Sequence, residues 1–127
     1  MAAMTQHAII LFAHGARDPL WAAPFEKLAA LVAARRPHQL VRLAFLELMT
    51  PNLADCVTSL AAENVGSITI VPAFMARGAH LRRDLPLLVA ALREQHPHLQ
   101  ISITEALGET DAVLGAMADW IAASQDA

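Results

Sequence analysis

The sequence predicts an α/β domain built on an open, doubly wound parallel sheet. Short apolar runs alternate with longer amphipathic segments along the 127 residues, which gives the order βαβαβαβα. The longer segments suit helical crossovers, and such crossovers join parallel strands with a right-handed turn in nearly all known sheets. The length fits one compact domain, residues 1–127, and is too short for two. We therefore expect four mainly parallel strands flanked by helices.

Four runs rich in Ile, Val, Leu and Phe have the length of strands. They cover residues 7–13, 40–46, 67–74 and 99–104. The first is apolar from Ala8 to Ala13, which is typical of a strand that is covered on both faces. This pattern supports a parallel sheet with helices on both sides.

Proline and glycine mark the limits of the first two helices. Segment 20–36 is rich in Ala and Leu, and Pro24 falls in its first turn, where a missing N–H costs nothing. Thr50-Pro51 predicts an N-cap followed by proline at the first helical position, and Gly66 predicts the end of that helix.

Similar signals predict the last two helices. Asp84-Leu85-Pro86 predicts the start of the third helix, and Pro97 predicts its end. Thr110 or Asp111 begins the last helix. Its apolar residues recur at the spacing expected of a core-facing side: Val113, Leu114, Met117 and Ile121.

Composition narrows the classes of protein to which the chain can belong. The apolar fraction is 56%, and the single cysteine, Cys56, excludes a disulfide framework within the chain and favours a reducing compartment. The apolar run 8–13 is too short to span a bilayer, and no Lys or Arg precedes it as in a signal peptide. The formal net charge is −3, with scattered charges. We expect a cytoplasmic protein that binds neither nucleic acid nor membrane.

Several chemistry-bearing residues follow the predicted strands. Open parallel sheets bind ligands outside the carboxyl ends of their strands. The first strand leads into His14, the second into Glu47, and the third through Arg77 to His80. Imidazole nitrogens with a carboxylate suit divalent Co, Ni, Fe and Zn ions, so His14 and His80 are the candidate metal ligands.

Other interpretations of these residues stay open. A single histidine at a strand end is more often a hydrogen-bonded loop residue than a ligand. Two such histidines, each next to a glycine or one residue from it, give the ligand interpretation the same weight as the structural one. Glu47 has two interpretations of equal weight: it is a metal ligand or base, or it caps the following helix. Glu105 and Glu109 are better explained as helix-flanking or solvated carboxylates.

Arginines near the same edge could hold an anionic ligand, although arginine is usually solvated. The guanidinium group matches carboxylate geometry. The four candidates are Arg17, Arg77, Arg82 and Arg83. No dinucleotide fingerprint and no phosphate-binding loop occur in the sequence, so no nucleotide cofactor is implied.

The remaining His, Trp and Cys residues are assigned structural roles. Four histidines fall on the opposite edge of the predicted sheet: His7, His38, His96 and His98. Trp21 and Trp120 are expected to pack, with Trp21 also within reach of the cleft. Cys56 has no histidine at a useful spacing, which argues against a catalytic thiol.

Several motifs together resemble the small sirohydrochlorin chelatases of the CbiX type. The motifs are Leu11-Phe12-Ala13-His14-Gly15-Ala16-Arg17-Asp18-Pro19, Phe45-Leu46-Glu47 before Thr50-Pro51, Val71-Pro72-Ala73-Phe74-Met75, Gly78-Ala79-His80 before Asp84-Leu85-Pro86, and Ala106-Leu107-Gly108. The resemblance spans almost the whole chain.

This resemblance implies a chelatase-like fold and the insertion of a divalent metal into a sirohydrochlorin-like tetrapyrrole. The metal is then a substrate (Co²⁺ or Fe²⁺, with Ni²⁺ as a further candidate), and no organic cofactor is needed. The resemblance also implies metal binding by His14 and His80, assistance from Glu47, and pairing of two short chains as a homodimer. Two alternatives remain: a non-enzymatic carrier of metal or tetrapyrrole, and a generic doubly wound binding module.

Overall fold

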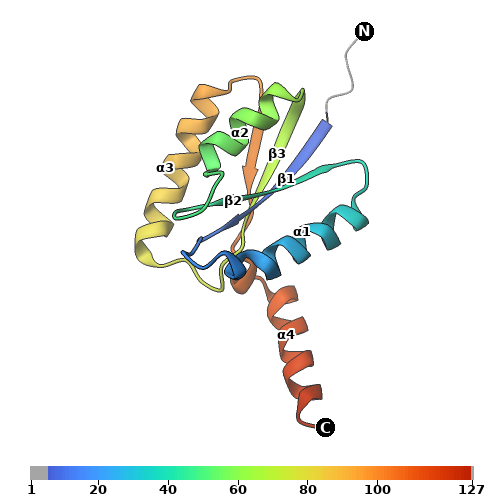
Figure 1. The fold of residues 1–127 in the computed structure, drawn as a ribbon. Coiled ribbons are helices and arrows are strands. Elements are labelled where there is room, and N and C mark those ends of the chain that lie inside the picture. The colour runs from blue at the N-terminus through green and yellow to red at the C-terminus, as the bar shows by residue number, and fades with distance from the viewer. Residues whose placement is uncertain (1–5, 127) are drawn as a thin grey trace.

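The structure, a computed structural model that describes residues 6–126, contains one four-stranded sheet (Figure 1). Its strands are β1 (Gln6–Ala13), β2 (Leu40–Phe45), β3 (Val65–Pro72) and β4 (Gln100–Ile103). Their spatial order is β2-β1-β3-β4, and every neighbouring pair is parallel. The predicted α/β class and the parallel sheet are confirmed.

Four α-helices and two 3₁₀ turns accompany the strands, and the last of each follows the final strand. They are η1 (Pro19–Ala22), α1 (Ala23–Arg35), α2 (Leu53–Ala62), α3 (Ala79–Gln95), η2 (Leu107–Glu109) and α4 (Asp111–Ser124). Pro24 lies in the first turn of α1, as predicted. Within residues 6–126, every helix is too short or too polar to cross a membrane.

One face of the sheet forms the main core with α2 and α3. Alternate residues of β1 and β3 point to this face, among them Ile10, Phe12, Ile68 and Ile70, and all four are fully buried. Leucines and valines of α2 and α3 pack on them: Leu53, Val57, Leu60, Leu85, Val89 and Leu92. This side of the sheet is sealed by the chain itself.

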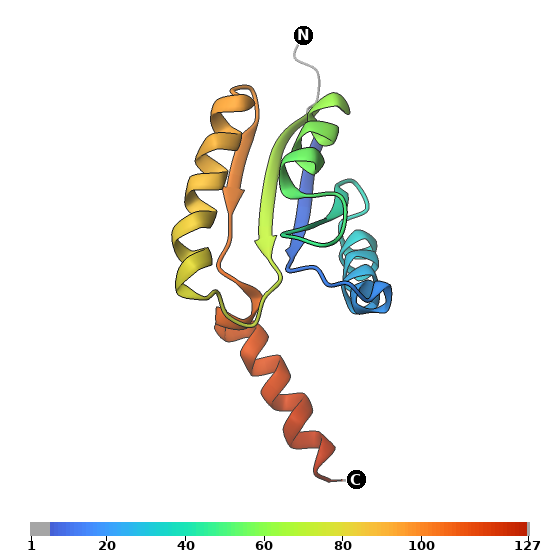
Figure 2. The same ribbon diagram turned by 60° about the vertical axis from the view of Figure 1, so that its left-hand side comes forward.

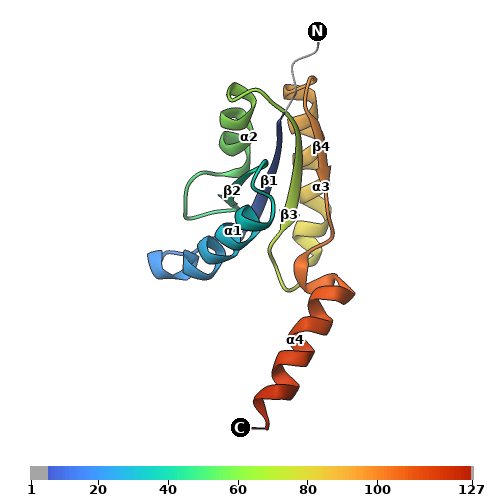
Figure 3. The same ribbon diagram turned by 90° about the vertical axis from the view of Figure 1, so that its right-hand side faces the viewer.

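The opposite face is only partly covered. Helix α1 packs on β2 and β1, where Ala13, Ala22 and Phe45 form a small second core. Over β3 and β4 the same face carries hydroxyl side chains, including Thr69 and Ser102. Figures 2 and 3 show that α4 does not return over this half of the sheet but runs away from the domain.

The predicted limits of the second helix are wrong. Asn52, not Thr50, is the N-cap, because its side-chain oxygen accepts a hydrogen bond from the N–H of Asp55 at 2.8 Å. The peptide bond between Thr50 and Pro51 is cis, and these residues belong to the turn before the helix. Gly66 does not end the helix but lies inside β3. Asn52 carries the same kind of capping side chain, so the error is one of position.

The predicted start of the third helix is also wrong. Helix α3 begins at Ala79, with Gly78 as its N-cap, so Pro86 lies inside it. An interior proline removes a hydrogen bond and costs about 3 kcal/mol. Burial of Leu85, Val89 and Leu92 at 1% exposure each offsets this cost, because each side chain contributes about 1.5–3 kcal/mol. His80 therefore lies in the first turn of a helix.

Helix α4 begins at Asp111, next to Thr110, as predicted, but its core-facing assignment is wrong. No residue of α4 is buried, and Leu114 and Ile121 are 40% and 57% exposed. Trp120 is not a packing residue within this chain, since it is 73% exposed. The apolar spacing is present as predicted, but no element within residues 6–126 buries it.

Candidate functional site

The exits of β1 and β2 stay paired beyond the strands, and this pairing brings His14 and Glu47 together. The N–H of Leu46 donates to the Ala13 carbonyl at 2.9 Å, and the N–H of Glu47 donates to the His14 carbonyl at 3.1 Å. The side chains then meet, with His14 Nε2 3.0 Å from Glu47 Oε1. Both side chains are more than half exposed, so the pair is open to a ligand.

Gly15 permits this close approach. Its φ of 93° is in the left-handed region, and a Cβ at this position would lie 1.8 Å from the carbonyl oxygen of Glu47. Glu47 does not cap α2, because Asn52 fills that position. The sequence left three roles open for Glu47, and the structure removes the capping role.

An apolar pocket of about 510 Å³ lies beside His14 at the carboxyl ends of β1 and β3. These two strands form the switch point of the sheet, since the connection from β1 leads to β2 on one side and that from β3 to β4 on the other. The pocket wall comprises Trp21, Phe25, Phe74, Met75, Val113 and Met117, with smaller residues between them. The His14 ring meets the Phe74 ring edge to face at 6.3 Å.

A close contact between two loops builds the far wall of the pocket. The N–H of Gly108 donates to the Phe74 carbonyl at 2.8 Å, and a Cβ on Gly108 would lie 1.9 Å from the Met75 carbonyl oxygen. The Nε of Arg77 donates to Glu109 Oε1 at 3.0 Å across the same junction. The hydrogen bond from Arg77 lowers the pKa of the Glu109 carboxyl. The predicted helix-flanking role of Glu109 thus includes an ion pair with Arg77.

His80 lies in a separate polar cluster on α3. Its Nε2 is 3.2 Å from Asp84 Oδ2, and its Nδ1 accepts from Arg83 at 3.2 Å. Its side chain is 84% exposed. Within residues 6–126, no three His, Cys, Asp or Glu side chains are grouped closely enough to hold a metal ion, so His14 and His80 belong to two distinct clusters.

The remaining predicted residues border the site in different ways. Arg17 is exposed in the turn after β1 and lines a shallow hollow with Leu48 and Met49. Arg82 is exposed in the first turns of α3. Trp21 packs on Phe25, with ring centroids 4.6 Å apart. It also lines the apolar pocket, in agreement with the prediction that it lies within reach of the cleft.

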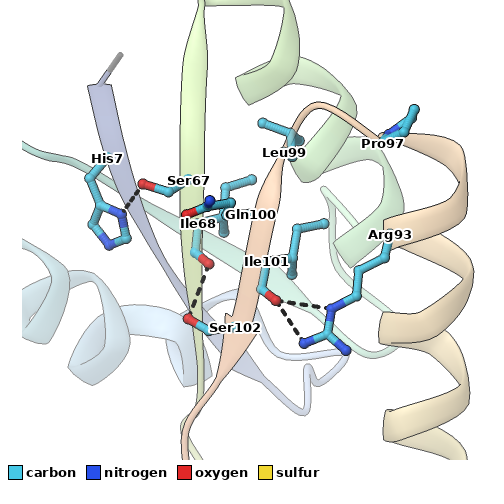
Figure 4. Close-up of a pocket in the computed structure, with 9 residues that line it drawn as sticks. All are labelled: His7, Ser67, Ile68, Arg93, Pro97, Leu99, Gln100, Ile101 and Ser102. Carbon is cyan, nitrogen blue, oxygen red and sulfur yellow. Dashed lines mark hydrogen bonds between the residues drawn. The ribbon is translucent and has the colours of Figure 1, made fainter. Parts of the chain in front are cut away.

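A larger hollow of about 620 Å³ lies along β4, away from the strand ends (Figure 4). The ring nitrogens of His7 are engaged by Ser67 at 2.6 Å and by Thr69 at 3.0 Å. Arg93 donates twice to the carbonyl of Ile101, at 2.7 and 3.0 Å, and so occupies an acceptor of the sheet edge. Arg93 thus ties the edge strand β4 to α3, and His7 links β1 to β3, which agrees with the structural role predicted for His7.

Cys56 is buried in α2, and its burial raises the pKa of the thiol to about 11. A thiol with so high a pKa is a poor nucleophile at neutral pH. The sequence-based argument against a catalytic cysteine agrees with this environment.

Some residues of the site were missed in the sequence. Phe74 was recognised only as part of a strand-end motif, and Asp84 only as a helix start. The spacing of His80 and Asp84 by four residues would have paired them if the helix had been extended back to Ala79. No sequence signal pairs Arg77 with Glu109, because the contact depends on how two loops meet.

The sequence was compared with protein families and with individual known proteins. The CbiX family profile matches residues 8–124. A sirohydrochlorin cobaltochelatase of Saccharolobus solfataricus is 30% identical over 106 residues, which are 79% of this chain and 81% of that protein. A sirohydrochlorin cobaltochelatase of Methanopyrus kandleri is 34% identical over 82 residues. That match covers 65% of this chain and only 57% of the Methanopyrus protein.

Solved structures show the same fold. A putative cobalamin biosynthesis CbiX protein from Marinobacter aquaeolei superimposes with a TM-score of 0.82 and 32% identity, over 94% of this chain and 98% of that one. The sirohydrochlorin chelatase SirB from Bacillus subtilis subspecies spizizenii, solved with cobalt, superimposes with a TM-score of 0.73. It is 21% identical, and the superposition covers 84% of this chain and 46% of SirB.

Proposed function

The chain belongs to the CbiX family, and on that premise we propose that it inserts a divalent metal, Co²⁺ or Fe²⁺ with Ni²⁺ as a further candidate, into sirohydrochlorin. The names of its relatives in Saccharolobus and Methanopyrus support the reaction and the tetrapyrrole. The metal is a substrate in this proposal, and the reaction uses no organic cofactor. A reducing, cytoplasmic setting fits the single buried thiol.

The observation that carries the proposal is the His14–Glu47 pair beside an apolar pocket at the switch point. Metal insertion replaces two pyrrole N–H protons with one divalent ion, so two protons must leave as the metal–nitrogen bonds form. A neutral imidazole and a carboxylate at hydrogen-bond distance can each accept a proton. A neutral imidazole has one free lone pair, so in this proposal His14 first ligates the incoming ion and accepts a proton only after the ion has passed to the macrocycle.

The shape and polarity of the site fit a flat macrocycle. The aromatic and Met side chains of the pocket present an apolar wall to the ring, and the volume of 510 Å³ is within the usual range for ligand sites. The peripheral carboxylates of the tetrapyrrole require cations, for which Arg17, Arg82 and Arg83 are the exposed candidates. Arg77 can contribute its terminal nitrogens while its Nε is bound to Glu109.

His80 is assigned as the second metal-handling residue. It stands in the first turn of α3 on an exposed surface, and its contact with Asp84 provides a second imidazole–carboxylate pair. We assign the loading of the ion to this pair and the insertion to His14 and Glu47. The proposed unit is a homodimer, in which two short chains together enclose the tetrapyrrole.

An absorbance assay with metal-free sirohydrochlorin and Co²⁺ or Fe²⁺ under anaerobic conditions tests the proposal. His14→Ala is expected to lower the insertion rate by at least about 100-fold, a typical loss for an acid–base residue. Glu47→Gln is expected to lower it by about tenfold or more. His38→Ala is the matched control, since His38 is exposed away from the pocket, and it should keep the full rate.

The outcomes separate the candidate functions. Tight binding of tetrapyrrole or metal without insertion would support the carrier alternative. Full turnover in His14→Ala would remove His14 from the reaction. The absence of both binding and turnover in the unaltered chain would leave only the generic binding module.

A further inference from the structure

A chain of hydrogen-bonded side chains crosses three strands on the open half of the sheet. Ser67 Oγ lies 2.6 Å from His7 Nδ1, and His7 Nε2 lies 3.0 Å from Thr69 Oγ1. Thr69 Oγ1 is 3.4 Å from Ser102 Oγ, which is in turn 3.4 Å from the Ile68 carbonyl oxygen. Figure 4 shows the first and the last of these contacts, with the Ser67 hydroxyl pointing to the His7 ring. The network therefore connects Ser67 to a backbone carbonyl.

This carbonyl determines the direction in which the protons of the network point. A carbonyl only accepts, so the single hydroxyl proton of Ser102 is donated to Ile68, and Ser102 accepts from Thr69. The proton of Thr69 is thereby used, so Thr69 accepts from His7, and the Nε2 of His7 carries the ring proton. In a neutral imidazole the other nitrogen is then an acceptor. His7 Nδ1 accordingly accepts the proton of the Ser67 hydroxyl.

The Ser67 end of the network has the arrangement of an activated nucleophile. A hydroxyl about 2.6–3.2 Å from a base, with the base oriented by a third group, is typical of a serine that attacks acyl centres. Here His7 is the base, and Thr69 orients it and holds its tautomer. Ser124, by contrast, donates to the carbonyl of Ile121 at 2.6 Å. The difference lies in the acceptor, because an imidazole takes up a proton and a backbone carbonyl does not.

Ser67 is open to a ligand. It lines the hollow of about 620 Å³ along β4 together with His7, and both residues are only partly buried. Helix α4 runs away from this half of the sheet (Figures 2 and 3). Gln100 is paired with Ser67 in the register of β3 and β4, so its side chain lies on the same face, one strand spacing of about 4.8 Å away. The Gln100 amide can therefore donate to a negatively charged oxygen that forms beside Ser67.

We propose that Ser67 is a nucleophile for acyl transfer, with His7 as its general base and Gln100 as the donor to the oxyanion. The hollow then takes short-chain carboxylic esters. Ser67 rises from the surface of the sheet between two neighbouring strands, so a short acyl group reaches its hydroxyl. Pro97 and Leu99 line the same hollow and offer an apolar surface to the alcohol part of the ester.

The proposed reaction is ester hydrolysis in two steps. In the first, a bond forms between Ser67 Oγ and the acyl carbon while the hydroxyl proton moves to His7 Nδ1, and the negative charge collects on the former carbonyl oxygen. Collapse of this intermediate breaks the ester bond, and the alkoxide leaves as an alcohol with the proton from His7. In the second, water attacks the acyl-serine with His7 again as the base. The carboxylic acid leaves, and the Ser67 hydroxyl is restored with water as the only co-reactant.

This activity does not depend on the proposed metal insertion. His7 is the second residue of β1 and His14 follows the last one, so at about 3.3 Å per residue the two lie about 23 Å apart along the strand. Ser67→Ala is therefore expected to leave the insertion rate unchanged. Each activity is measured by its own assay, and the failure of one leaves the other standing.

A fluorophosphonate probe tests the nucleophile, because it phosphonylates activated serine hydroxyls. Peptide mass spectrometry of the unaltered chain should show Ser67 labelled at least about 100-fold faster than Ser124, the lower range of base catalysis. His7→Asn, which cannot take up the proton, should lower the rate at Ser67 by a similar factor. Ser124→Ala is the matched control and should keep it. An unlabelled Ser67, equal labelling of Ser67 and Ser124, or an unchanged rate in His7→Asn each overturns the proposal.

Thr69 tests the direction of the protons, and it does so even if His7→Asn fails to fold. Thr69→Val removes the acceptor of the Nε2 proton and releases the other tautomer, which should lower the labelling of Ser67 by about tenfold. Thr69→Ser keeps a hydroxyl and should restore the rate. Circular dichroism verifies the fold of each variant. Equal rates in Thr69→Val and Thr69→Ser would show that Thr69 does not orient His7, and the proposed relay would then be wrong.

Hydrolysis of p-nitrophenyl acetate tests the class of reaction. Nitrophenolate should appear in a burst of about one per chain before the steady state, as expected when an acyl-enzyme accumulates. Gln100→Ala should slow the burst by about tenfold or more through loss of the oxyanion donor. If Ser67→Ala releases nitrophenolate as fast as the unaltered chain, the hydrolysis comes from other groups, and the assigned activity is wrong.

Discussion

Helices α3 and α4 carry similar apolar spacing, but the chain treats them differently. Leu85, Val89 and Leu92 of α3 are 1% exposed against the sheet, whereas Leu114 and Ile121 of α4 are 40% and 57% exposed. Helix α3 also contains an interior proline and still packs fully. The comparison shows that apolar spacing identifies the apolar face of a helix. Whether this face is covered by other parts of the same chain depends on the topology of the fold.

The largest expected effect compares these two helices directly. Leu85→Ala removes a side chain from the sealed core and should lower the free energy of unfolding by about 3 kcal/mol. Leu114→Ala should cost less than about 1 kcal/mol in dilute solution, since its side chain is exposed within one chain. Urea unfolding followed by tryptophan fluorescence measures both. Equal losses at low protein concentration would show that α4 packs within its own chain.

Substitution of two glycines tests the backbone in a crowded region, at Gly15, and in the exposed helix α4, at Gly115. Gly15→Ala places a Cβ against the Glu47 carbonyl at a positive φ and should cost roughly 2 kcal/mol and lower the insertion rate. Gly115→Ala in α4 meets no atom within 4 Å and should raise stability by about 0.5–1 kcal/mol. Thermal unfolding and the absorbance assay report both effects. A tolerated Gly15→Ala would mean that the His14–Glu47 pairing does not depend on that close approach.

The sequence was sufficient to predict the sheet and the edge on which His14 and Glu47 meet, because strand periodicity and the direction of parallel strands determine both. The sequence was insufficient where local start signals compete with the burial of apolar side chains in the folded chain. Pro86 is a strong start signal for a helix, yet α3 begins at Ala79, where Leu81 in its first turn packs against the main core, and His80 therefore lies on the helix. The packing of α4 also differs from the prediction. The spacing of apolar residues along a helix does not specify which surface, if any, will cover them.

Substrate contacts provide a third test, outside both cores. Replacing Arg82 and Arg83 by Ala should raise the KM for sirohydrochlorin about tenfold and change kcat less than about twofold, because contacts to remote carboxylates are similar in the ground and transition states. The double replacement of Arg35 and Arg36 removes the same charge at the far end of α1 and serves as the control. A fall in kcat at unchanged KM would instead connect Arg83 to the chemistry through its contact with His80.

The smallest expected effect concerns the ion pair that joins the two loops of the pocket wall. The hydrogen bond from Arg77 lowers the pKa of Glu109, so folding favours the charged carboxylate. The stabilisation is therefore fully present above the ordinary carboxyl pKa of about 4.3 and is lost as the pH falls through the lower, folded value. Glu109→Gln should reduce stability slightly and equally at pH 7 and pH 5.5, with a gap that closes only in acid. Chemical unfolding across this range, with Glu105→Gln as the control at an exposed carboxyl, measures the gap. A gap that already closes between pH 7 and pH 5.5 would show that the pKa of the Glu109 carboxyl is raised rather than lowered, and that Arg77 is free to bind substrate through all of its nitrogens.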